Sequence, residues 1–166
     1  MPGVQTGALP ISFTFDVPEG THVEGVPAVI DVDEPWYIKP ESGRLLGSPA
    51  DETPSEPCDA QPEELDLAIA IDRIEQAMSF GIGRLHSKWA GLRSFVADKT
   101  MVAGFARKTP GFFWLAGQGG YGIQTCPGMA RIAADLARGR AFPSDVADRG
   151  IDASDLSPDR LSLEVA

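Results

Sequence analysis

Two segments of this chain place apolar residues at helical spacing, and each follows a group of segments that have the composition of β-strands. The strand candidates alternate apolar and polar residues or are rich in aromatic and branched ones, and they lie at 11–17, 27–32, 36–38, 44–47, 84–97, 100–106 and 111–117. The order is strands, helix, strands, helix. It predicts an α+β fold with a mainly antiparallel sheet and flanking helices, and not alternating βαβ units.

The first helix is predicted over 62–78, with Pro62 at its first position and two glutamates near the positive end of its dipole. One apolar stripe runs along it at Leu67, Ile71, Ile74 and Met78. The second helix is predicted to start near Thr125 or Pro127 and to stop at Gly139, with a buried face made of Met129, Ile132, Ala133 and Leu136. From Arg140 onward the chain is polar and shows little periodicity.

Composition narrows the possible functions. The 166 residues carry 24 acids and 14 bases, a formal net charge of -10, which argues against nucleic-acid and anionic-membrane partners. The N-terminus shows neither the basic start nor the long apolar run of a signal peptide. No window approaches the roughly 20 apolar residues of a membrane span. Cys58 and Cys126 are far apart and lack metal-ligand spacing, which predicts a cytoplasmic location without disulfides.

The residues from Gly117 to Gly122 spell G-x-G-x-x-G between a strand candidate and a helix. A dinucleotide fingerprint also needs a second parallel strand after that helix, with an acid at its end for the ribose. Nothing after Arg140 resembles such a strand, and Asp145 has a loop-like setting. A free-standing nucleotide-binding domain is therefore an alternative that the pattern does not favour.

Two other interpretations of this glycine loop remain open. Glycines let another molecule approach the backbone, and the helix that follows directs free N–H groups and a positive dipole end toward the same place. Such a place suits an anion, or a ring that becomes anionic during a reaction. The plainer alternative is a tight turn that lets a strand pack against a helix.

Three segments carry a resemblance that covers nearly all of the chain. They are WYIKPESGRLLGSPADE, WAGLRSFVADKTMVAGF and GFFWLAGQGGYGIQTCPGMARIAADL, and the block from Trp89 to Thr125 is the most specific. With these three segments in this order, the chain resembles the C-terminal half of an FAD-dependent oxidoreductase of the D-amino-acid oxidase and glycine oxidase superfamily. Within it, the chain is most similar to the bacterial D-arginine dehydrogenase group.

The resemblance implies a division of the chain. Residues 1–110 would form a substrate-binding domain, 111–140 the C-terminal strand, glycine loop and helix of an FAD-binding domain, and 141–166 a C-terminal tail. The family's main FAD-binding fingerprint has no counterpart before Ile11, so the N-terminal FAD half is expected to be absent here. The expected partners are an amino-acid substrate, a separate FAD-binding half, and further copies of the chain that cover exposed apolar surface.

The resemblance also assigns site residues. Arg93 would grip the substrate carboxylate, Tyr37 would help to hold it, and the Gly120 carbonyl would meet the amino group. The flavin of FAD would lie against a loop made of Gly117, Gln118, Gly119, Gly120, Tyr121, Gly122, Ile123 and Gln124. No side chain of the chain is needed as a catalytic acid or base for hydride transfer, and no metal is implied.

Each of these assignments has a plainer alternative. A lone arginine in a strand is commonly a surface residue, and Tyr37 could be a half-buried sheet tyrosine. For the whole chain the predicted function is the substrate-domain part of an enzyme that oxidises D-amino acids or related amines by hydride transfer to FAD. The alternative is a non-catalytic remnant or interaction subunit that keeps the fold.

Overall fold

The computed structural model describes residues 4–6, 11–33, 35–50 and 53–161. By its internal contacts the chain forms two compact units, one made of residues 7–92 and the other of residues 1–6 and 93–166. The boundary lies between Leu92 and Arg93 and thus differs from the 110/111 boundary expected from the sequence. The assignment of these parts to a substrate domain and an FAD domain stays a prediction.

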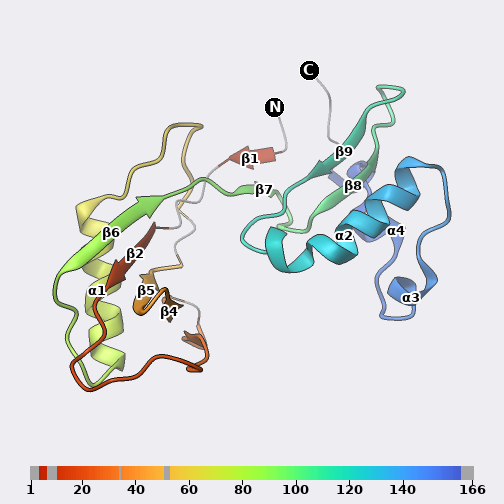
Figure 1. Cartoon of the computed structure of the whole chain (residues 1–166). Helices are drawn as coiled ribbons and strands as arrows, with labels where there is room; N and C mark the ends of the chain where they lie inside the picture. The colour runs from red at the N-terminus through yellow and green to blue at the C-terminus, as the bar shows by residue number, and fades with distance from the viewer. Residues whose placement is uncertain (1–3, 7–10, 34, 51–52, 162–166) are drawn as a thin grey trace. The chain divides into compact units, whose positions relative to one another are not determined.

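The unit of residues 7–92 contains a five-stranded antiparallel sheet in the order β3-β4-β5-β2-β6 (Figure 1). The strands are β2 Ile11–Phe15, β3 Val29–Ile30, β4 Tyr37–Glu41, β5 Arg44–Ser48 and β6 Leu85–Ala90. A two-residue turn joins β4 to β5, and both of its residues, Ser42 and Gly43, have positive φ. This is the turn geometry that matches the twist of a hairpin.

Helix α1, Glu64–Ala77, packs its apolar stripe on this sheet. Leu67, Ala70 and Ile74 are buried against Ile11, Phe13 and Phe15 of β2, and Ile71 and Met78 pack at the edge of the cluster. The predicted stripe is thus confirmed, but the helix begins two residues later than predicted. Pro62 precedes it and Glu63 is its N-terminal capping residue.

The second unit is built on two short antiparallel pairs. One joins β1 Val4–Thr6 to β7 Ser94–Val96, and the other joins β8 Val102–Phe105 to β9 Phe113–Ala116. The prediction of a single strand over 84–97 was wrong. That segment is divided between β6 and β7, which belong to different units and are separated by Gly91, Leu92 and Arg93.

Helix α2, Gly122–Ala137, packs on β8 through Met129 and Ile132, both buried beside Ala103. Gly139 ends it as predicted: its φ is +67°, its N–H bonds to the Leu136 carbonyl, and the Arg140 N–H bonds to the Asp135 carbonyl. The predicted start at Thr125 or Pro127 was too late. A turn over 118–121 leads directly into the helix at Gly122, and Pro127 lies in the second turn.

The region after α2 is more regular than its composition indicated. It forms α3 Ser144–Ala147, α4 Ala153–Leu156 and a 3-10 helix, η1, Pro158–Leu161. Asp152 and Asp155 make a reciprocal capping box at the start of α4. Leu156 of α4 is buried in the cluster beneath α2, and Pro158 of η1 packs against Gly104 of β8. The last residues of the predicted tail, 162–166, lie outside the described residues.

Candidate active site

The glycine loop joins the end of β9 to the start of α2 (Figure 1). Gly117 and Gly119 have φ values of +72° and +53°, in the left-handed region that favours glycine. The Tyr121 N–H bonds to the Gln118 carbonyl, and both the N–H and the hydroxyl of Thr125 donate to the Tyr121 carbonyl. The loop is therefore fixed by its own hydrogen bonds.

Two of the glycines are required by packing within the unit. A β-carbon on Gly117 would lie 3.0 Å from Val96 Cγ1, and one on Gly119 would lie 2.6 Å from Phe95 Cε1. The Gly119 N–H also donates to the Ser94 carbonyl at 3.0 Å. At these two positions the loop approaches β7 of the same chain, which is the plainer role that the sequence left open.

Gly120 is different, because it is exposed and faces the guanidinium of Arg93. A β-carbon at Gly120 would lie 2.9 Å from Arg93 Nη1. The Arg93 guanidinium itself lies over the ring of Phe95, 5.6 Å from the centroid, and Arg93 is half-buried. Two of the three predicted substrate residues are thus brought together.

Two further residues lie beside this arginine, and the sequence-based assignment of the site included neither. Phe95 is buried, and the guanidinium of Arg93 lies over its ring. The ammonium nitrogen of Lys99 lies 5.9 Å from the centroid of the same ring. Positions 93 and 95 share one side of an extended segment, so the alternation places the two side chains together. Lys99 has a φ of +58°, next to Asp98, whose carboxylate accepts the Thr100 N–H. Such an aspartate turn is a signal readable from the sequence.

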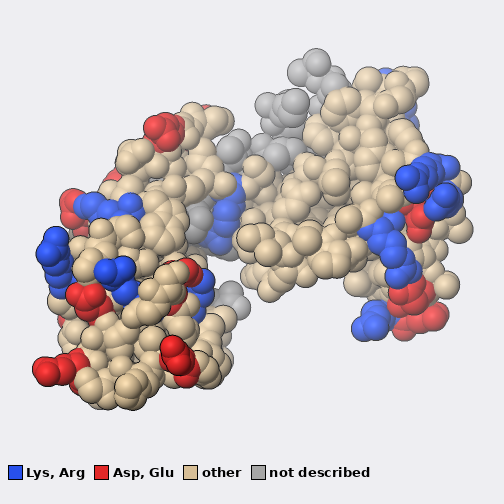
Figure 2. All heavy atoms as spheres, viewed as in Figure 1, with Lys and Arg blue, Asp and Glu red and all other residues tan. Residues whose placement is uncertain are grey.

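The start of α2 adds backbone N–H donors to this corner. Tyr121 precedes the helix and makes no side-chain cap, and the first turn contains no acidic residue. The chain carries no charge from Thr109 to Ala130, and Figure 2 shows an uncharged face over this loop and the beginning of α2. Two cations, free N–H groups and the positive helix end therefore favour an anion here, in a protein that is acidic overall.

Tyr37, the third predicted substrate residue, belongs to the other unit. It opens β4, is half-buried, and lies opposite Ser48 of β5 and Ile30 of β3. Its proposed role beside Arg93 therefore stays a prediction.

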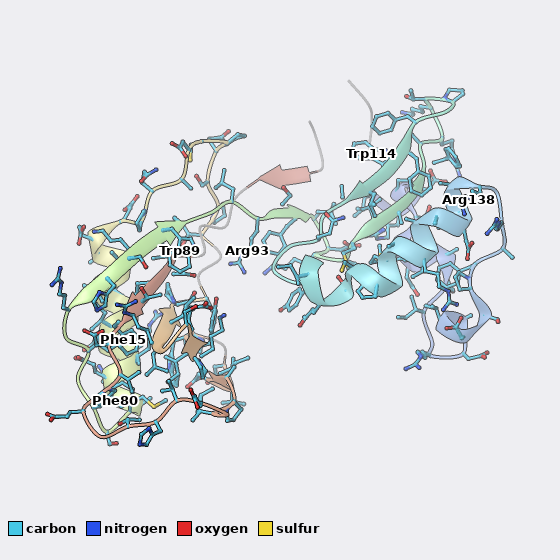
Figure 3. All side chains as sticks on the ribbon, in the orientation of Figure 1. Phe15, Phe80, Trp89, Arg93, Trp114 and Arg138 are labelled. Atoms are coloured by element: carbon cyan, nitrogen blue, oxygen red, sulfur yellow. The ribbon has the colours of Figure 1, made fainter. Side chains whose placement is uncertain are left out.

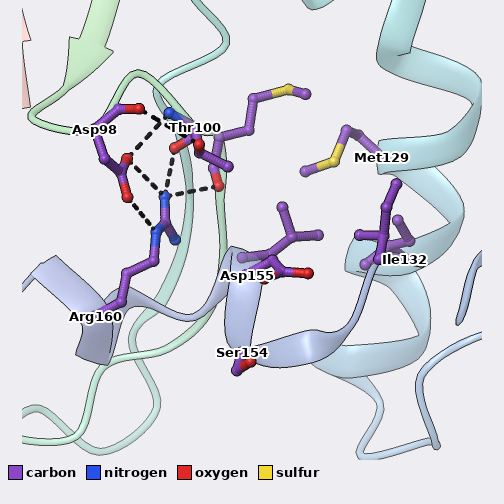
Figure 4. Close-up of a pocket in the computed structure, with 10 residues that line it drawn as sticks. Asp98, Thr100, Met129, Ile132, Ser154, Asp155 and Arg160 are labelled. Carbon is purple, nitrogen blue, oxygen red and sulfur yellow. Dashed lines mark hydrogen bonds and ion pairs between the residues drawn. The ribbon is translucent and has the colours of Figure 1, made fainter.

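A hollow of about 480 Å³ lies elsewhere in the second unit (Figure 4). Its apolar lining comes from Met101, Met129, Ile132, Ile151 and Leu156. Its one arginine, Arg160, is engaged within the chain: it pairs with Asp98 at 2.8 Å and donates to the carbonyls of Thr100 and Met101. These contacts hold η1 against the turn before β8. Because Arg160 is used in this way within the chain, we do not assign the hollow to the active site.

Two absences can be stated for the part of the chain that the structure describes. No three acidic, histidine or cysteine side chains cluster there as metal ligands would. Of the helices described, none has both the length and the hydropathy needed to cross a bilayer.

Residues 10–136 match the protein family described as "DAO: FAD dependent oxidoreductase". The chain belongs to this family. The match includes the glycine loop, Arg93 and Tyr37, and it ends within α2.

Solved structures of the family share the fold. Iminodiacetate oxidase from Chelativorans sp. BNC1 matches with a TM-score of 0.71 at 14% identity, over 93% of this chain and 39% of the oxidase. Glycine oxidase from Geobacillus kaustophilus matches with a TM-score of 0.68 at 21% identity, over 99% of this chain and 40% of the oxidase. The fructosamine oxidase of Aspergillus fumigatus has a TM-score of 0.66 at 12% identity, over 88% of this chain and 39% of that enzyme. The chain thus spans about two fifths of the length of these enzymes.

Proposed function

We propose that this chain provides the substrate-binding part and the C-terminal flavin-contacting segment of an enzyme that oxidises D-amino acids or related amines. The observation that carries the proposal is the meeting of Arg93 with Gly120 at the start of α2. The guanidinium offers two parallel donors to a substrate carboxylate. Because Gly120 has no side chain, the guanidinium can lie directly against the backbone of the loop, next to the carbonyl that would meet the substrate's amino group.

The loop and helix start also fit the predicted cofactor, FAD. When bound, FAD supplies the acceptor for the hydride that leaves the substrate's α-carbon. The N–H groups at the beginning of α2 would stabilise negative charge near them, and the uncharged surface from Thr109 to Ala130 suits a flat ring system. Oxidation of an amino acid gives an imine, which water converts to a 2-oxo acid and ammonia. Arg93 holds the carboxylate during these steps.

Several finer assignments belong to the same proposal. The preference for basic D-amino acids rests on the resemblance to the D-arginine dehydrogenase group. A cytoplasmic location rests on Cys58 and Cys126, both of which are free thiols in the structure. A partner that supplies the main FAD-binding half, or self-association, would cover exposed apolar side chains such as Leu115, Tyr121 and Ile123.

The test is to purify the chain together with the polypeptide encoded directly upstream of it. The pair should absorb near 450 nm because of bound flavin, and it should reduce a dye when D-amino acids are added. Arg93→Gln should lower kcat/KM about 100-fold, because a charge-assisted bidentate contact contributes roughly 2–3 kcal/mol. An amine without a carboxylate should be oxidised equally by both forms. A pair without flavin and without dye reduction would refute the proposal.

Arg84→Gln is the matched control. Arg84 is an exposed arginine in the other unit, and its replacement makes the same change in net charge. Its kcat/KM should remain that of the unmodified pair. An equal loss for both substitutions would show that Arg93 acts only through the overall charge.

A further inference from the structure

The hollow of about 480 Å³ in the second unit has a largely apolar lining (Figure 4). Met129 and Ile132 of α2 are buried in this lining, as is Leu156 of α4. Ile151, which precedes α4, is 41% exposed. Buried side chains thus form the floor of the hollow, and an accessible one borders its opening. A hollow of this volume and lining suits a small molecule with an apolar body.

The hollow is separate from the candidate active site. Figure 3 shows Arg93 near the beginning of α2 and Arg138 at the end of that helix. The hollow is lined instead by the middle of α2, through Met129 and Ile132, and by residues of α4. Neither Arg93 nor Gly120 belongs to its lining. A ligand in this hollow would therefore occupy a second site.

The polar side chains of this lining present acceptors to a ligand. The Thr100 hydroxyl donates its hydrogen to the Asp98 carbonyl. The Ser154 hydroxyl donates to the Asp152 carboxylate, so both hydroxyl oxygens can still accept a hydrogen bond. The guanidinium of Arg160 donates to the Asp98 carboxylate and to backbone carbonyls. A ligand that satisfies these groups must itself supply the donors.

Asp155 gives the hollow one unbalanced negative charge. Its carboxylate accepts the Asp152 N–H at 2.9 Å and forms no ion pair with any residue that the structure describes. The second carboxylate of the lining, that of Asp98, is balanced by Arg160 at 2.8 Å. Figure 4 shows Asp155 on α4 beside the apolar side chains of the lining. A cation would be stabilised there, and an anion would be repelled.

We propose that this hollow binds an alkylammonium ion, with the ammonium at Asp155 and the alkyl chain against Met129 and Ile132. An ammonium group has donors and no acceptor, which matches the hydroxyl and carboxylate oxygens of the lining. The alkyl chain covers apolar surface that is otherwise open to water. The inference goes beyond the proposed function, because this ligand carries no carboxylate and contacts none of the residues assigned to the substrate. Either can fail alone.

The methionine methyl signals of the purified, isotope-labelled chain test the site by nuclear magnetic resonance. Met101 and Met129 line the hollow, whereas Met78 belongs to the other unit and is the internal control. Hexylammonium should shift the signals of Met101 and Met129 and leave that of Met78 unchanged. Hexanoate has the opposite charge and hexanol has none, so each should bind at least about tenfold more weakly. Met101→Leu, Met129→Leu and Met78→Leu assign the signals.

Substitutions separate this site from general binding. Asp155→Asn should weaken hexylammonium binding at least about tenfold, because it removes the charge. The amide oxygen of the asparagine can still accept the Asp152 N–H, so the start of α4 stays capped. Asp148→Asn, at an exposed aspartate of the same unit, is the matched control and should leave binding unchanged. Ile151→Ala removes part of the apolar wall and should weaken binding about threefold. Far-ultraviolet circular dichroism checks that each variant is folded.

Three results would overturn the inference: unchanged signals of Met101 and Met129 at millimolar hexylammonium, equal binding of hexanoate or hexanol, or unchanged binding by folded Asp155→Asn. Arg93→Gln should bind hexylammonium as the unmodified chain does. A loss of flavin-dependent activity in that variant therefore bears on the proposed function alone.

Discussion

Each of the two units of this chain is stabilised internally in a different way. In residues 7–92 one continuous cluster joins the sheet to α1, with Ile11, Phe13, Phe15 and Ile74 completely buried. In the other unit two smaller clusters lie around the β8–β9 pair, one containing Trp114 and the other Met129. There, the Arg160 contacts supplement the apolar core, and close contacts at glycines such as Gly117 and Gly119 are more frequent than in the first unit, where Gly47 approaches Phe13. The first unit should therefore be sensitive mainly to lost volume, and the second also to volume added at its glycines and to lost hydrogen bonds of Arg160.

The largest effect is expected at Phe13, which is completely buried and packs in the cluster beneath α1. Phe13→Ala should lower the free energy of unfolding by about 3–5 kcal/mol, since a large cavity replaces the ring. Urea unfolding followed by circular dichroism measures this loss. Phe112→Ala, at a ring that is 36% exposed in the other unit, should cost clearly less. Equal losses would abolish the distinction between the two cores.

The second unit should instead respond to added volume at Gly119. Gly119→Ala forces alanine into a positive φ and places its β-carbon 2.6 Å from the buried Phe95 ring. The expected loss is about 2–4 kcal/mol, the sum of a left-handed backbone cost and overpacking. Gly128→Ala is the control, because Gly128 lies within α2 and an added methyl would meet nothing within 4 Å. It should raise stability by up to about 1 kcal/mol, measured by the same urea titration.

The order of elements could be predicted because each depends on local patterns. The stripe on α1, the face of α2 and the stop at Gly139 all follow from helical spacing and glycine chemistry, and all three are confirmed. The break between β6 and β7 could not be predicted, because apolar composition continues through Gly91 and Leu92. What divides the strands is their membership in two different units, which is a tertiary property.

The candidate site was predictable only in part. The G-x-G-x-x-G pattern indicated an unusual backbone conformation. It could not indicate that the absence of a side chain at Gly119 makes room for the Phe95 ring, while Gly120 faces the Arg93 guanidinium. Those contacts connect residues about 25 positions apart and depend on β7 lying beside the loop. The helices after Arg140 were missed for a related reason. Their short length gives no periodicity, and their stability comes from buried Leu156 and from Arg160.

The attachment of η1 should depend on the hydrogen bonds of the Arg160 guanidinium. Arg160→Lys keeps the positive charge but loses the fork that reaches Asp98, Thr100 and Met101 together. We expect a loss of about 1–2 kcal/mol, seen as faster amide hydrogen exchange across 153–161. Arg138→Lys, at the exposed end of α2, should leave that exchange unchanged. Unchanged exchange in Arg160→Lys would show that the forked hydrogen bonds of the guanidinium do not hold this segment.

The smallest effect is the response of the same contact to acid. Hydrogen bonds from Arg160 lower the pKa of Asp98 below its ordinary value of 3.8, so the carboxylate stabilises the folded unit above that value. The contribution declines as pH falls below 3.8 and is lost once Asp98 is protonated in the folded protein as well. The side chain of Asp98 is 42% exposed, so solvent keeps the effect small. Exchange across 153–161, corrected for its intrinsic pH dependence, should therefore accelerate below about pH 4, and Asp98→Asn should remove the acceleration. If the corrected exchange of the unmodified chain stays constant down to pH 3, the ion pair contributes nothing to this unit, and the contrast with the larger core rests on the glycine contacts alone.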